Sequence, residues 1–219
     1  MSMNFFLQLE NVWMWVMELK RALRQLGELK RLGGTMRLAA ESWGADWKCL
    51  IATVMSAQSR DETTIVIASE LFSKYNSLDK LANANYSDVL HVFSGLNYNR
   101  TKAKNVIACA KMLIDSFNGK IPRDLDKLIL LPGVGRKTAN VFLSEHGYPA
   151  IGVDTHLAYI SQKLSWTKNK DSHKIEMDLK KLFAKNVWSS VNPTVVRFGK
   201  KYTSRKKKNI ILKEINKIN

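Results

Sequence analysis

Apolar residues recur at spacings of three and four through most of the 219-residue chain, and this is the period of an α-helix. Residues 101–117, TKAKNVIACAKMLIDSF, show it clearly, with Ala103, Val106, Ala110 and Leu113 on one side of a predicted helix. Only four prolines and eleven glycines are present, which favours long regular elements. We therefore predict an all-α fold.

One segment interrupts this pattern sharply. LPGVGRKTAN, residues 131–140, places a proline and two glycines between two apolar helical segments. Pro132 has no amide hydrogen and ends the first helix, while Gly133 and Gly135 allow backbone angles that a side chain would penalise. The sequence thus predicts a helix, a glycine-containing hairpin and a second helix over about residues 124–146.

The start of the second helix is a predicted anion site. Amides in the first turn of a helix have no intrahelical partners and carry the positive end of the dipole, and the glycines let a phosphate approach the backbone. Arg136 and Lys137 add formal charge. The alternative is an ordinary helical corner in which the glycines only cap.

Lys137 has two interpretations. The helix dipole and the neighbouring cations favour a neutral amine, which is a nucleophile suited to attack a sugar carbon or a carbonyl. Alternatively, the ammonium grips a phosphate. The segment GVDTH, residues 152–156, also leaves alternatives open: Asp154 could cap the helix that follows, or take a proton and offset positive charge. His156 is expected to be a packed or hydrogen-bonding residue, because no cluster of metal ligands accompanies it.

The formal net charge of +16 points to a polyanionic partner. Residues 197–219 carry nine Lys or Arg against one Glu, although such a block can also be a solvated tail. The apolar segment 5–19 is too short and too polar to span a bilayer, so we predict a core or interface helix there and no membrane partner. Cys49 and Cys109 form no C-x-x-C pair and are expected to be buried free thiols.

Taken together, the motifs closely resemble the helix-hairpin-helix DNA glycosylases, and within them the endonuclease III branch. Similarity covers about residues 40–165. The segments that carry it are, in chain order, MSAQSRDETT (55–64), GLNYNRTKAKNV (95–106), LPGVGRKTAN (131–140) and VDTH (153–156), with a weaker similarity in RFGKKYTS (197–204).

The resemblance implies two helical domains with a DNA-binding cleft between them. One is a helical barrel over residues 39–149 that contains the hairpin, and the other combines residues 1–38 with 150–219. It also implies excision of a damaged base that is flipped out of the duplex. The expected partner is double-stranded DNA with damaged bases or abasic sites. The protein is expected to be an intracellular monomer, either cytoplasmic or associated with the nucleoid.

The resemblance also assigns roles to residues. Lys137 matches the nucleophile and Asp154 its acidic partner; the imine formed with the sugar permits β-elimination, which cleaves the strand. Gln58 matches the residue that fills the gap left by the flipped base, and Leu96 or Asn97 matches the intercalating wedge. The other expected DNA-binding residues are Gly133, Gly135, Arg136, Thr138, Lys200 and Lys201.

Endonuclease III relatives usually carry four C-terminal cysteines that hold a [4Fe–4S] cluster, and the chain departs from this pattern. Ser204 stands near the expected first ligand, and no cysteine follows Cys109. Because such a cluster requires thiolates, we expect no iron–sulfur cofactor. The family hairpin often coordinates a monovalent cation, and the sequence leaves open whether this one does.

The leading hypothesis is a bifunctional DNA glycosylase and abasic-site lyase that acts on oxidised pyrimidines. Relatives that only remove a base carry a residue other than lysine at the position of Lys137, so the lysine favours lyase activity. A mismatch or oxidised-purine glycosylase is one alternative. A hairpin module that only grips DNA, without catalysis, is another; such a module would not need Asp154 or Gln58.

Overall fold

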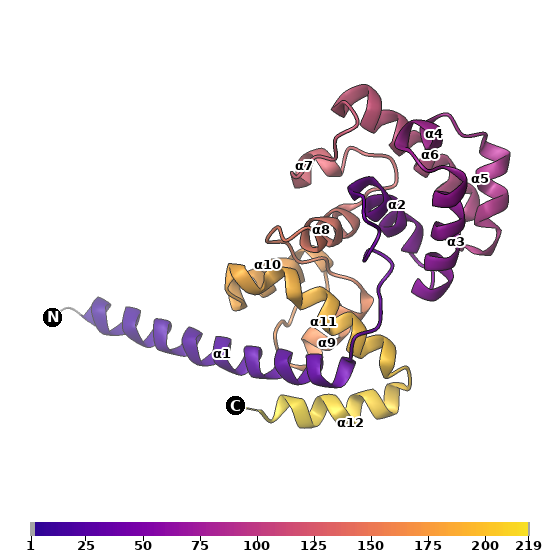
Figure 1. Cartoon of the computed structure of the whole chain (residues 1–219). Coiled ribbons are helices and arrows are strands. Elements are labelled where there is room, and N and C mark those ends of the chain that lie inside the picture. The colour runs from indigo at the N-terminus through magenta and orange to yellow at the C-terminus, as the bar shows by residue number, and fades with distance from the viewer. Residues whose placement is uncertain (1–2, 219) are drawn as a thin grey trace. The chain divides into compact units, whose positions relative to one another are not determined.

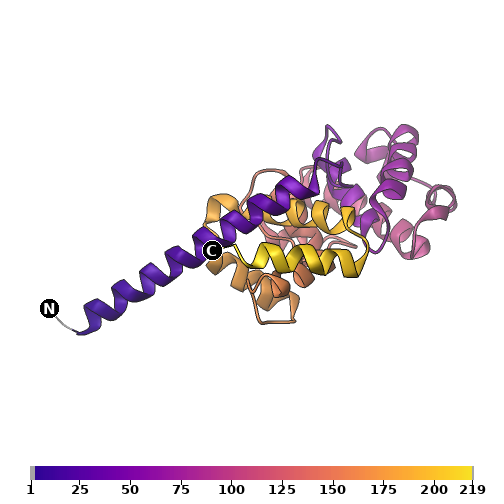
Figure 2. The same ribbon diagram turned by 90° about the horizontal axis from the view of Figure 1, so that it is seen from below.

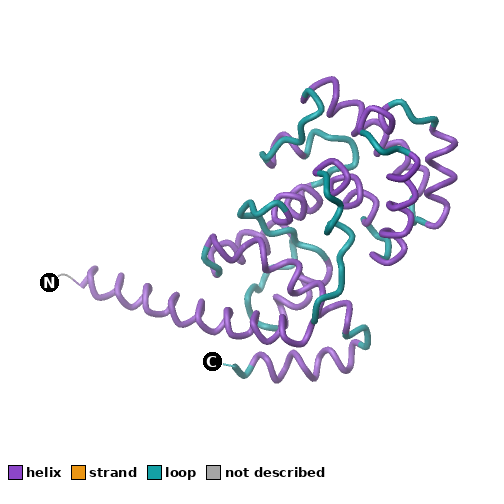
Figure 3. Tube along the Cα trace, viewed as in Figure 1, coloured by secondary structure: helices purple, strands orange, loops and turns teal. Residues whose placement is uncertain are grey.

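The computed structural model describes residues 3–218, with side chains described for residues 13–218. Helices joined by loops make up this whole region, and none of residues 3–218 lies in a β-strand (Figure 3). The prediction of an all-α fold is therefore confirmed.

The helices pack into two units. The hairpin unit is Arg37–Gly152, and the terminal unit combines Met1–Met36 with Val153–Asn219. The sequence placed the corresponding boundaries after residues 38 and 149. Each unit has its own buried apolar residues.

The hairpin unit is built around a central buried helix, α2, which packs against α3, α6 and α8 (Figure 1). Every residue of α2 from Cys49 to Met55 is buried, so α2 is a core element of this unit. The elements of this unit are α2 (Asp46–Ser56), α3 (Asp61–Lys74), α4 (Leu78–Ala82), α5 (Tyr86–Val92), η1 (Phe93–Gly95), α6 (Asn99–Phe117), α7 (Leu125–Leu128) and α8 (Arg136–Glu145).

The terminal unit is organised by a long helix, α1, which packs against α11, with α12 running beside it (Figure 2). Leu212 and Ile215 of α12 are buried, and α12 also contacts α9. The elements of this unit are α1 (Met3–Gly33), α9 (Thr155–Lys163), α10 (Ser172–Leu182), η2 (Lys185–Val187), α11 (Trp188–Lys201) and α12 (Arg205–Asn216).

Helix α1 ends at two consecutive glycines, Gly33 and Gly34, which have different structural roles. A Cβ on Gly33 would lie 2.8 Å from the backbone nitrogen of Phe198, so only glycine lets α1 approach α11 this closely. Gly34 has φ +77, a left-handed conformation that stops the helix. In the described part of the chain, no helix combines the length and the apolar character needed to cross a membrane.

Candidate active site

The hairpin between α7 and α8 is a tight turn over Leu131–Val134. The Val134 N–H donates to the Leu131 carbonyl oxygen over 3.0 Å. Pro132 precedes Gly133, which has φ +80, and this is the residue order of a type II turn. A Cβ on Gly133 would also lie 2.9 Å from Cβ of Asn105 on α6. Both the backbone angle and the space therefore require glycine at position 133.

Gly135 differs from Gly133. Its φ of −85 is one that any residue adopts, so the expectation that this glycine supplies an unusual backbone angle is wrong. Apart from the adjacent residues of the chain, no described atom lies within 4 Å of the position that its Cβ would occupy, and the residue is exposed. The backbone before α8 thus presents an open surface, which a phosphate can approach closely.

Helix α8 begins at Arg136, as the sequence predicts, and its first intrahelical bond runs from the Ala139 N–H to the Gly135 carbonyl oxygen over 2.9 Å. Arg136 is exposed and Lys137 is partly exposed on the first turn. The side chain of Thr138, however, is only 6% exposed. Thr138 is thus almost fully covered in this structure, and its contact with DNA stays a prediction.

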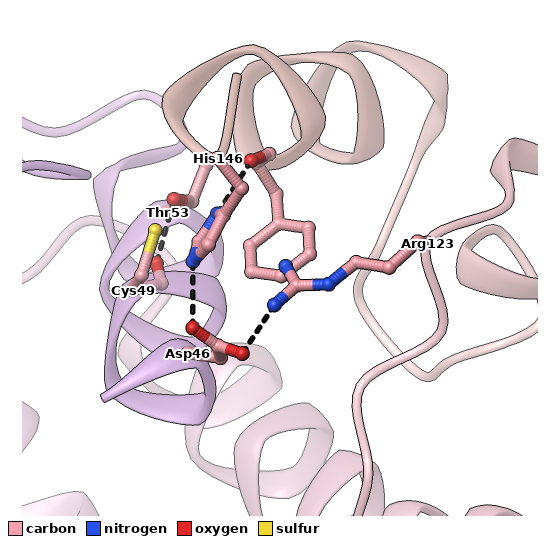
Figure 4. A network of polar contacts seen from close by, with 6 residues as sticks. Asp46, Cys49, Thr53, Arg123 and His146 are labelled. Atoms are coloured by element: carbon pink, nitrogen blue, oxygen red, sulfur yellow. Dashed lines mark hydrogen bonds and ion pairs between the residues drawn. The ribbon is translucent and has the colours of Figure 1, made fainter. Parts of the chain in front are cut away.

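Ala139, Phe142 and Leu143 anchor α8 in the core of the hairpin unit, as their spacing predicts. Polar contacts of His146 hold the other end of the helix. His146 Nε2 lies 2.9 Å from Asp46 Oδ1, and His146 Nδ1 lies 2.9 Å from the Phe142 carbonyl oxygen (Figure 4). These contacts join the end of α8 to the start of α2, 100 residues away in the sequence.

Arg123 completes this network. Its guanidinium forms an ion pair with the second carboxylate oxygen of Asp46 and lies 5.2 Å from the centre of the Phe142 ring (Figure 4). Cys49 lies one turn further along α2, and burial raises the pKa of its thiol to about 12. Burial has the same effect on the pKa of Cys109. Both cysteines are buried free thiols, as the sequence predicts.

The chain that leaves the hairpin unit passes directly against α8. A Cβ on Gly152 would lie 2.5 Å from Val141 Cγ2 and 3.2 Å from the Lys137 carbonyl oxygen, so glycine is required there. Asp154 follows two residues later in the sequence and caps α9: its Oδ1 accepts a hydrogen bond from the Leu157 N–H over 2.8 Å. The capping interpretation of Asp154 is confirmed, and its chemical role stays a prediction.

Gln58 and Asn97 lie together on the surface of the hairpin unit. Both are exposed, and the side-chain amide of Asn97 donates to the Gln58 carbonyl oxygen over 2.6 Å. Leu96 is different, because it is 4% exposed and belongs to the hydrophobic core. Of the two wedge candidates, Asn97 is therefore on the surface and Leu96 is covered, and the assignment of the wedge to either residue stays a prediction.

Sequence reasoning missed two residues in this region. Tyr98 is 66% exposed beside Asn97 and has φ +56. Lys102 is buried and donates from Nζ to Ser59 Oγ over 2.8 Å. The sequence did hold a signal for Lys102, since it stands four residues before Val106 on the apolar face of the helix.

The remaining expected site residues lie in the terminal unit. Lys200 and Lys201 occupy the last turn of α11, where the helix dipole favours cations, and Lys201 is exposed. His156 is packed, as predicted: a Cβ on Gly199 of α11 would lie 2.5 Å from its Nδ1. Among the described residues, no group of three or more His, Cys, Asp and Glu side chains is arranged to hold a metal ion.

The chain is similar to known proteins in both sequence and fold. A family model described as the HhH-GPD superfamily base excision DNA repair protein matches residues 51–185. Endonuclease III of Thermotoga maritima is 36% identical over 157 residues, which are 71% of this chain and 73% of that protein. Endonuclease III of Bacillus subtilis is 35% identical over 156 residues, with 70% and 71% of the two chains covered. A solved structure of a trapped endonuclease III–DNA covalent intermediate superposes with a TM-score of 0.78 at 31% identity, covering 86% of this chain and 89% of the other.

Proposed function

Because the chain belongs to the HhH-GPD superfamily of base excision DNA repair proteins, we propose that it is a bifunctional DNA glycosylase and abasic-site lyase. The observation that carries the proposal is the place of Lys137, a partly exposed residue on the first turn of α8, just after an open glycine turn. The similar solved structure is that of an endonuclease III trapped in a covalent intermediate with DNA. An amine nucleophile produces such a covalent intermediate.

In the proposed reaction, Lys137 Nζ forms a bond to C1′ of the deoxyribose while the bond from C1′ to the base breaks. The base leaves with the bonding electron pair and takes up a proton. The C1′–O4′ bond then breaks with its electron pair going to O4′, O4′ takes up a proton from nitrogen, and an imine between Lys137 and C1′ remains. Removal of a C2′ proton then expels the 3′ phosphate, which cleaves the strand. We assign to Asp154 the acceptance of the amine proton and the stabilisation of developing positive charge.

The residues around the nucleophile suit a DNA backbone. The open surface at Gly135 and the exposed guanidinium of Arg136 can receive a phosphate at the positive end of α8. Gln58, Asn97 and Tyr98 are exposed together elsewhere on the hairpin unit, and we assign them to the support of the gap that a flipped nucleotide leaves. Lys200 and Lys201 supply further phosphate contacts from the terminal unit.

The substrate class is tested by single-turnover assays on duplexes with one lesion each. We expect cleavage of a thymine glycol duplex at least about tenfold faster than cleavage of duplexes with 8-oxoguanine or a G·T mismatch, because pocket contacts discriminate flipped bases by their polar edges. Faster cleavage of the 8-oxoguanine or mismatch duplex would replace the oxidised-pyrimidine assignment. Strand cleavage at a plain abasic site is the control for an active enzyme.

We also propose that the chain holds no iron–sulfur cluster. Its two cysteines are buried in the core of the hairpin unit with pKa values near 12, so they do not fit a set of thiolate ligands. In the terminal unit, Leu212 and Ile215 of α12 supply apolar packing instead.

Metal analysis tests this second proposal. Protein produced with excess iron and purified without oxygen should contain less than about 0.1 iron per chain and show no thiolate-to-iron absorption. About four irons per chain would contradict it. Zinc and copper in the same sample serve as a control for adventitious metal.

A further inference from the structure

Two hydrogen bonds join the turn after α2 to residues before and within the first turn of α6. Asn97 holds the backbone of Gln58 through its side-chain amide, and Lys102 holds the hydroxyl of the next residue, Ser59. The partners are 39 and 43 residues apart in the sequence. Gln58 and Ser59, which are consecutive residues of the turn after α2, are thus both held by residues 97–102.

Lys102 is an unusual residue for its position. It lies on the apolar face of α6 with Val106, Cys109 and Leu113, all of which are buried. Its exposed fraction is only 6%, and burial lowers the pKa of its amine to about 8. A methionine would fill the same space without desolvating an amine. Packing therefore does not explain the lysine, whereas its hydrogen bond to Ser59 does.

The joined segments each contain a residue in the left-handed region. Gln58 has φ +54 and Tyr98 has φ +56, a conformation that residues other than glycine rarely adopt. Such conformations persist where the surroundings impose them. Here the Gln58 carbonyl is held by Asn97, and the Tyr98 carbonyl accepts a hydrogen bond from the Lys102 N–H over 3.0 Å. Lys102 thus contacts both segments, one with its side chain and the other with its backbone.

We propose that Lys102 is a positioning residue that, through Ser59, holds Gln58 and the Asn97–Tyr98 segment in the arrangement needed to support an extrahelical nucleotide. Lys102 itself is too buried to touch DNA. The inference rests on the proposed function, because exposed side chains need this fixed relation only if duplex DNA is opened beside them.

Base excision and strand cleavage at an abasic site should depend differently on the arrangement of Gln58 and the Asn97–Tyr98 segment. Excision of a paired base requires the base to leave the stack, which costs free energy. Side chains that fill the gap offset part of this cost. A preformed abasic site has no base to unstack. Loosening the turn should therefore slow base excision much more than strand cleavage at an abasic site, whereas a general loss of fold would slow both.

The test compares Lys102→Met with Lys104→Met in the full chain. Lys104 is an exposed lysine on the same helix, so its variant removes the same charge without removing the contact. Under single turnover, we expect Lys102→Met to slow excision from a thymine glycol duplex about tenfold, the effect of one lost charge-assisted hydrogen bond, and to change cleavage of an abasic-site duplex less than about threefold. Fluorescence of 2-aminopurine beside the lesion should report a smaller flipped population.

Ser59→Ala provides the second arm, because it removes the acceptor and adds no volume. It should reproduce the split between the two substrates, and the double variant should be no slower than either single variant, as expected for two partners of one contact. If Lys102→Met fails to fold, Ser59→Ala alone carries the test.

Equal losses on both substrates, no loss relative to Lys104→Met, or additive losses in the double variant would overturn the role of Lys102. Failure of the unsubstituted protein to cleave an abasic site would instead contradict the proposed function. The two failures are therefore distinguishable.

Discussion

Strand cleavage should be lost when Lys137 is replaced by glutamine. The side chain keeps its approximate length, but an amide nitrogen is not a nucleophile, so neither the covalent intermediate nor the β-elimination can occur. We expect the cleavage rate at an abasic site to fall at least about 10³-fold, as for other enzymes that lose a nucleophile. DNA affinity should change less than about tenfold, because only one of many cationic contacts is removed.

A second substitution separates the two interpretations of Lys137. Lys137→Arg keeps the positive charge and the ability to bind a phosphate, but a guanidinium stays protonated and does not attack carbon. If Lys137 only grips phosphate, Lys137→Arg retains cleavage; if it is the nucleophile, Lys137→Arg is as inactive as Lys137→Gln. Lys127→Gln is the matched control, since Lys127 is an exposed lysine on α7, just before the hairpin.

Asp154→Asn should slow turnover about 10²-fold while leaving the fold intact. Asparagine caps a helix about as well as aspartate, so the hydrogen bond from the Leu157 N–H to the side-chain oxygen at position 154 can be kept. What is lost is the negative charge that accepts a proton and stabilises positive charge at the sugar. The measurement is the single-turnover rate with DNA affinity and thermal unfolding recorded in parallel.

A matched control for the cap exists in the same unit. Asp171 caps α10 in the same way, with its Oδ1 accepting from the Lys174 N–H over 2.9 Å. Asp171→Asn should leave turnover unchanged. Unchanged turnover in Asp154→Asn as well would reduce Asp154 to a cap and would favour the hypothesis of a hairpin module that only grips DNA.

The sequence predicted the helices and the hairpin well, because both depend on local rules. The period of the apolar residues predicted α6 and α8. Pro132 followed by Gly133 predicted the turn, because a type II turn favours proline at its second position and a left-handed glycine at its third. The capping role of Asp154 follows the same logic, because a cap bonds to a backbone three residues away.

Burial and long-range contacts could not be predicted in the same way. Leu96 and Asn97 are adjacent in the sequence, and only the packing of the loop shows that one is in the core and the other on the surface. Gly135 was expected to adopt backbone angles that a side chain would penalise, but the structure shows ordinary backbone angles and open space around the position of its Cβ. The contact between Asp46 and His146 joins residues 100 positions apart, and no local pattern marks either residue.

The central claim is that the amine of Lys137 condenses with deoxyribose. Incubation of the protein with an abasic-site duplex and borohydride converts an imine into a stable secondary amine, and mass spectrometry of the digested adduct then locates the modified residue. We predict a single reduced sugar adduct on the peptide that contains Lys137, and none in Lys137→Gln. An adduct confined to another lysine, or no adduct in a preparation that cleaves the strand, would contradict the claim.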